Sequence, residues 1–153
     1  MKTTKTKGEN MNYVAKLNIA SVLYGIGAWV IVECMLNVYR ISRISGWDIS
    51  NVTNSMMILL LISVGIFTFV FSRYTKNHLG ARKIRYLTTI LWVPYFSLFV
   101  YGFRVLFPMV DRGDVPPPIV GLVIMAGLVI YPIYIAFVTM LSMNNEKVAE
   151  SKG

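Results

Sequence analysis

Two ionisable residues that could do chemistry interrupt apolar stretches of this sequence. Glu33 lies in the first apolar stretch, and Arg104 lies near the end of the third. Asn37 and Arg40 follow Glu33 at helical spacings, so a helix places all three on one stripe. In an apolar environment a carboxylate pairs with a cation, faces water, or holds and releases a proton. Glu33, Asn37, Arg40 and Arg104 are therefore the candidate site.

Three arrangements are open for these charges. Glu33 pairs with Arg104 across two helices, Arg104 extends to lipid head groups, or Glu33 pairs only with Arg40. We favour the pair with Arg104, because the two residues lie at nearly the same depth when each is counted from the predicted cytoplasmic end of its helix. A structural role for these charges is favoured over transport or gating.

Other catalytic and metal-binding chemistry finds little support in the sequence. Cys34 is the only cysteine and His78 the only histidine, which excludes an intrachain disulfide, a thiolate zinc cluster and haem ligation by paired imidazoles. The HExxH, GxSxG, Walker A and GxGxxG patterns are absent. Asp111 and Asp114 flank a turn that we interpret as solvated. We expect no enzyme activity, no cofactor and no metal site.

Four apolar blocks must position these residues. They run from about 17 to 38, 52 to 72, 86 to 107 and 118 to 143. Each holds roughly 20 mostly apolar residues, which at about 1.5 Å per residue span the ~30 Å core of a bilayer. Backbone amides in hydrocarbon find no water, so such segments close their hydrogen bonds internally as helices.

The composition agrees with a membrane protein, since 56% of the 153 residues are hydrophobic and only 14% are charged. We predict an all-α integral membrane protein whose four transmembrane helices pack as a small bundle over residues 17–143. An N-terminal tail (1–16) and a C-terminal tail (144–153) flank this domain. Met1 and Met11 are both compatible with it as the start of translation.

Basic residues gather on one side of this arrangement. The two tails and the 73–85 loop hold eleven lysines and arginines, against four on the opposite side. The positive-inside bias therefore predicts cytoplasmic termini, N-in and C-in, in a cell membrane, and compact loops favour a bacterial inner membrane. The loop lacks zinc-finger or helix-turn-helix spacing, so we expect no nucleic-acid binding. Its candidates for contact with anionic lipid are Arg73, Lys76, Arg82, Lys83 and Arg85.

Small residues predict where helices approach closely. Ser21 and Gly25 have a small-xxx-small spacing. The other candidate approach points are Gly27, Ala28, Gly65, Gly121, Ala126 and Gly127.

Two functional classes remain. The chain is either a small accessory, regulatory or protective protein that binds another membrane component, or a small oligomeric transporter or channel that uses Glu33 as a proton or cation site. Trp29 and Glu33 in the first of four helices resemble the small multidrug transporters, but the likeness does not extend to the other helices, and no transport role is carried over. We favour the binding role, with the bilayer, another membrane protein or a second copy as partner, because one charged stripe does not make a conduction path.

Overall fold

The structure is a computed structural model that describes the backbone of residues 3–79 and 83–150, and the side chains of residues 12–79 and 84–142. Four of its helices are long and apolar enough to cross a membrane. In chain order the elements are α1 (Thr3–Leu36), α2 (Val38–Ser45), α3 (Ile49–Leu79), the 3₁₀ helix η1 (Lys83–Leu87), α4 (Thr88–Leu106), the 3₁₀ helix η2 (Arg112–Asp114) and α5 (Pro118–Glu150).

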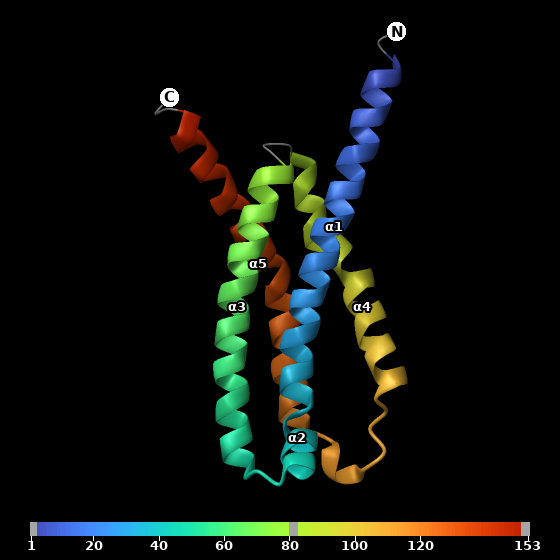
Figure 1. The fold of residues 1–153 in the computed structure, drawn as a ribbon, viewed down its shortest axis with the longest axis vertical. Coiled ribbons are helices and arrows are strands. Elements are labelled where there is room, and N and C mark those ends of the chain that lie inside the picture. The colour runs from blue at the N-terminus through green and yellow to red at the C-terminus, as the bar shows by residue number, and fades with distance from the viewer. Residues whose placement is uncertain (1–2, 80–82, 151–153) are drawn as a thin grey trace.

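The long helices run alongside one another in a narrow bundle. Helix α1 contacts α3, α4 and α5, whereas α3 and α4 lie on opposite sides of α1 (Figure 1). The two ends of the chain lie at one end of the bundle, hereafter the termini end, and α2 and η2 lie at the other, hereafter the α2 end (Figure 1). An even number of long helices requires this placement of the chain ends.

The helices extend beyond the predicted apolar segments at several ends. Helix α1 begins at Thr3, within the predicted N-terminal tail, and α5 continues to Glu150, beyond the predicted limit at 143. Helix α3 reaches Leu79, which shortens the predicted 73–85 loop. Hydropathy marks only the part of a helix that suits hydrocarbon, whereas the backbone hydrogen bonds continue into polar sequence. Within the residues whose side chains are described, the four membrane-spanning candidates are Asn12–Leu36, Ile49–Leu79, Ile84–Leu106 and Pro118–Ser142.

A break at Asn37 creates a short helix, α2, that the apolar pattern did not predict. The Asn37 side chain donates a hydrogen bond to the Glu33 carbonyl at 2.9 Å, and such competition with the backbone bends helices. Helix α2 ends at Gly46, whose φ of 70° is left-handed and whose N–H donates to the Ser42 carbonyl. Glycine adopts this conformation without a β-carbon clash, so the chain turns sharply there into α3.

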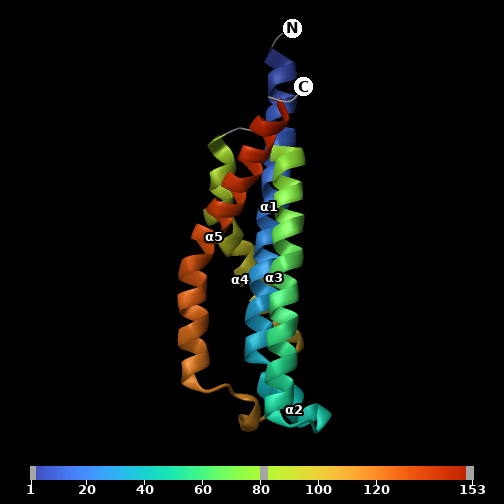
Figure 2. The same cartoon turned by 90° about the vertical axis from the view of Figure 1, so that its left-hand side faces the viewer.

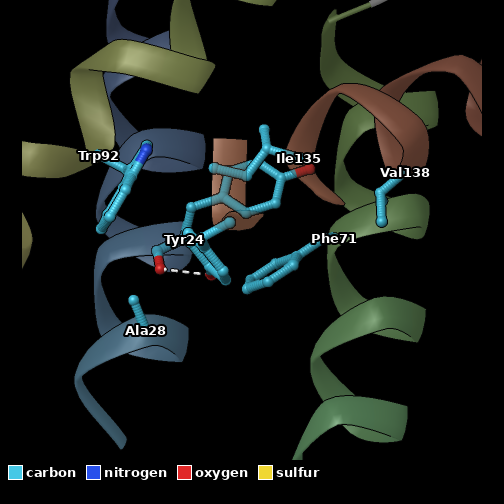
Figure 3. Close-up of a cluster of buried hydrophobic side chains, with 7 residues drawn as sticks. Tyr24, Ala28, Phe71, Trp92, Ile135 and Val138 are labelled. Atoms are coloured by element: carbon cyan, nitrogen blue, oxygen red, sulfur yellow. Dashed lines mark hydrogen bonds between the residues drawn. The ribbon is translucent and has the colours of Figure 1, made fainter. Parts of the chain in front are cut away.

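The core of the bundle is an aromatic cluster towards the termini end. Figure 3 shows Tyr24 of α1 between Phe71 of α3 and the side chains of α4 and α5. The Tyr24 and Phe71 ring centres are 4.2 Å apart, and those of Trp92 and Tyr131 are 4.8 Å apart. The Tyr131 hydroxyl donates a hydrogen bond to the Tyr24 carbonyl at 2.8 Å. This cluster therefore joins all four long helices by packing and α1 to α5 by a hydrogen bond.

Helix α5 has a packed half and an unpacked half. Among its described side chains, at residues 118–142, the buried ones lie in residues 131–142 and none lies in residues 118–130, where Leu128 packs against the aromatic cluster while only partly buried. The unpacked half stands away from α1 and α3 at the α2 end (Figure 2). The packed half carries all the side-chain hydrogen bonds that α5 makes to other helices in the described residues, through Tyr131, Tyr134 and Ser142.

The glycines differ in whether another helix lies close to them. A β-carbon at Gly25 would lie 2.9 Å from the Tyr95 β-carbon, so α1 and α4 are in close contact there. At Gly65, Gly121 and Gly127 nothing lies within 4 Å of such an atom. The small residues therefore mark a close helix contact at Gly25 but none at these three positions.

Candidate functional site

Glu33 and Arg104 line one cavity at the α2 end. Glu33 lies in the last turn of α1, where Asn37 breaks the helix, and Arg104 lies in the last turn of α4. The cavity has a volume of about 510 Å³ and continues under the connection from α4 to α5. Its remaining walls are apolar and are formed by Leu36, Phe103, Phe107, Pro108, Met109, Val115 and Pro116.

The Glu33 carboxylate has one hydrogen-bond partner among the described residues. The Asn37 amide donates to its Oε2 atom at 2.8 Å and also to its carbonyl oxygen. The predicted stripe therefore brings Glu33 and Asn37 together. One turn earlier, the indole N–H of Trp29 approaches the carboxylate but forms no hydrogen bond with it. That indole packs against Phe103 of α4, with ring centres 5.8 Å apart.

The predicted ion pair between Glu33 and Arg104 is not formed in the structure. No ion pair within 4.0 Å joins them, and Arg104 makes no hydrogen bond to any other residue whose side chain is described. The alternative pair of Glu33 with Arg40 is not formed either. The opposite charges therefore face a common cavity without contact.

Arg40 leaves the stripe because α2 turns it towards the end of α4. Its Nη1 atom donates to the Phe107 carbonyl at 3.1 Å. The last carbonyls of a helix have no partner within the helix and carry partial negative charge. Arg40 thus caps α4 and ties it to α2.

Arg43 and Asp114 form the best-defined ion pair at this end, and the sequence analysis missed it. The Arg43 Nε atom donates to Asp114 Oδ1 at 2.7 Å, and Nη2 donates to Oδ2 at 2.9 Å, a bidentate geometry. Asp111 Oδ2 lies 3.7 Å from Arg43 Nε, and Asp111 Oδ1 caps the η2 turn by accepting a hydrogen bond from the Gly113 N–H. The Arg43 guanidinium holds the pKa of Asp114 below its ordinary value.

This pair corrects part of the interpretation of the outer turn. Asp111 is exposed, as a solvated turn requires, but Asp114 is only 2% exposed. The contact joins residues 71 positions apart, so no local spacing reveals it. The sequence gives only a general indication of ion pairing at the α2 end, where acidic and basic residues are equally numerous. They are Glu33, Asp48, Asp111 and Asp114 against Arg40, Arg43, Arg104 and Arg112.

The predicted lipid-contact residues that the structure describes, Arg73, Lys76, Lys83 and Arg85, lie at the termini end. Arg73 is exposed and Lys76 half-buried near the end of α3. Arg85 in η1 is instead buried, at 1% exposed, so a head-group contact there requires its side chain to move. Arg82 lies outside the described residues, and Lys83 lies in η1 with a side chain outside them.

Within the described part of the chain, no group of three or more His, Cys, Asp or Glu side chains could hold a metal ion. No protein-family model, curated protein or solved structure matches the sequence. The function proposed below is therefore argued from the sequence and the structure of this chain alone.

Proposed function

We propose that this chain is an integral membrane protein of a bacterial inner membrane, with both termini in the cytoplasm. The four long apolar helices support insertion. The two tails and the 73–85 segment hold eleven lysines and arginines, whereas the segments of the α2 end hold four, Arg40, Arg43, Arg104 and Arg112. This asymmetry supports the inside position of the termini end.

Within the membrane, we propose that the protein acts as an accessory, regulatory or protective protein that binds another membrane component. The observation that carries this proposal is the unpacked half of α5, residues 118–130, which buries no side chain. An apolar groove beside it reaches α1, α2 and α3, and three flexible methionines, Met35, Met56 and Met57, help to line it. Methionine-rich surfaces adapt readily to apolar partners.

A transport role, with Glu33 as an intramembrane proton or cation site, is the second candidate. The exposure of Glu33 to a cavity favours it. The aromatic cluster opposes it, because it fills the bundle between Glu33 and the termini end. The helices also supply no charged residue along this route, at positions 17–32, 49–72, 86–103 and 118–142. A single copy therefore offers no charged residue along the route, and we expect transport to require an oligomer.

Site-specific photo-crosslinking in native membranes tests the binding role. A photoreactive residue at Leu122, which is 64% exposed on the unpacked half of α5, should give an adduct of defined mass with a membrane protein or a second copy. The matched control is Leu98 of α4, which is 63% exposed and should give lipid adducts alone. The same lipid adducts at both positions would contradict the proposal.

Proton flux separates the two candidates. Vesicles that contain the purified protein should show the same proton permeability with Glu33 and with Glu33→Gln. A flux that the wild type supports and the variant abolishes would establish the transport role instead.

A further inference from the structure

The cavity that Glu33 and Arg104 share has an unusual electrostatic arrangement. It presents one carboxylate and one guanidinium, and no ion pair joins them. Asn37 supplies one hydrogen bond to the carboxylate, and Arg104 donates none within the described residues. Both groups thus keep hydrogen-bonding capacity directed at the same space.

Leaving such groups without partners is costly beside apolar walls. Ionised side chains near hydrocarbon are stabilised when they pair or are hydrated, and charge-assisted hydrogen bonds are the strongest way to pair them. A ligand with one positive and one negative group would satisfy both residues together. A ligand with a single charge could pair with only one of the two residues. The other residue would stay unsatisfied, and its like charge would repel the ligand.

We propose that this cavity binds a zwitterion that carries an ammonium and a phosphate group, the chemistry of a phosphatidylethanolamine head group. The ammonium lies against the Glu33 carboxylate, beside the rings of Phe103 and Phe107, whose faces attract cations. The phosphate lies on Arg104, since a guanidinium fits phosphate oxygens in a bidentate manner.

The position of the cavity agrees with this ligand. It lies beside the ends of α1 and α4, where the apolar spans of both helices finish at Leu36 and Leu106. In the proposed membrane topology, on which this inference rests, that depth is the head-group level of one leaflet. Met109 and Val115 of the following connection line the cavity, and acyl chains would extend along the exposed apolar surface of α4.

Binding can be measured on purified protein in detergent, which makes the result independent of any protein partner. Native mass spectrometry with dioctanoyl phosphatidylethanolamine and dioctanoyl phosphatidylglycerol should show a preference of roughly 10-fold or more for the former, because only its ammonium can pair with Glu33. Glu33→Gln should remove the preference, and Arg104→Gln should weaken binding of both lipids. Arg104→Lys should retain much of the phosphate contact.

Two variants at the same end but outside the cavity are matched controls. Asp48→Asn and Arg112→Gln remove the same kinds of charge from exposed positions and should leave the preference unchanged. Free phosphoethanolamine separates the two sources of the ligand: binding as tight as that of the lipid identifies a soluble zwitterion, and weaker binding identifies the lipid.

Equal binding of the two lipids by the wild type would overturn the proposal. So would a preference that survives Glu33→Gln in protein whose thermal unfolding matches the wild type. Should Glu33→Gln fail to fold, Arg104→Gln decides alone, because Arg104 is exposed and makes no contact on which folding depends: undiminished lipid binding refutes the site. Neither result would affect the crosslinking test for a partner at α5, so the two proposals can fail separately.

Discussion

The contact between α1 and α4 at Gly25 allows a quantitative test of the bundle. In Gly25→Ala the new β-carbon would lie 2.9 Å from the Tyr95 β-carbon, 3.1 Å from the Phe96 backbone nitrogen and 3.3 Å from the Trp92 carbonyl oxygen. All three atoms are fixed to the α4 backbone, so no rotation of a side chain relieves the clash. The two helices must move apart.

The size of the effect follows from these distances. Carbon atoms attract best at about 3.5–4.0 Å, so the helices must separate by roughly 0.6 Å at this point, and a gap of this size forfeits about a quarter or more of the local dispersion energy. Overpacking of this kind costs about 1–3 kcal/mol. Alanine also raises helix propensity over glycine by about 0.5–1 kcal/mol, which offsets part of the loss.

Gly65→Ala is the matched control, because nothing lies within 4 Å of a β-carbon there. It carries the same gain in helix propensity without the clash. The difference in the free energy of unfolding between the two variants therefore isolates the strain, about 1–3 kcal/mol. Reversible unfolding of each variant by sodium dodecyl sulfate in mixed micelles, followed by tryptophan fluorescence, measures this difference.

Equal stability of the two variants would refute the close approach of α1 and α4. A loss of stability in Gly65→Ala would instead contradict the open space around Gly65, since it would mean that this glycine also lies in a contact. In either case the arrangement of helices around α1 would need revision.

Three further predictions concern other contacts. The ion pair with Arg43 lowers the pKa of Asp114. The stability that this pair gives the fold is therefore complete above the ordinary Asp pKa of about 3.9 and is lost as the pH falls through the lowered pKa. Thermal unfolding between pH 7 and pH 3 should show this loss of stability in the wild type but not in Asp114→Asn. Tyr131→Phe removes one buried hydrogen bond to a carbonyl of α1 and should cost about 0.5–1.5 kcal/mol in the same micelle titration. In a Cys34→Ser background, Val110→Cys, at an 87% exposed position, should react with a membrane-impermeant maleimide added outside intact cells, and labelling only after lysis would contradict the proposed topology.

The long helices could be predicted from sequence because their apolar segments are long enough to cross a membrane, and a backbone in hydrocarbon must close its hydrogen bonds internally. The apolar length of each segment fixes the element, whatever its packing. Helix α2 could not be predicted in this way, because a hydrogen bond from Asn37 and the φ angle of Gly46 define it. The helical spacing brought Asn37 to Glu33 correctly, but it could not foresee that the break redirects Arg40 to α4. Depth alone placed Glu33 and Arg104 at one level, without fixing the distance between them.

The two halves of α5 differ in the contacts that would be lost if each were displaced from the bundle. Displacing residues 131–142 would disrupt the aromatic cluster and the hydrogen bonds of Tyr131, Tyr134 and Ser142. Displacing residues 118–130 breaks no side-chain hydrogen bond within the described chain and uncovers no fully buried side chain of that half, although it loosens the contact of Leu128 with the aromatic cluster. Elements with few buried contacts have the lowest cost of local rearrangement. The Arg43–Asp114 pair holds η2, and with it the start of α5, against α2. Weakening this pair should therefore change the position of the unpacked half while leaving the core of the bundle intact.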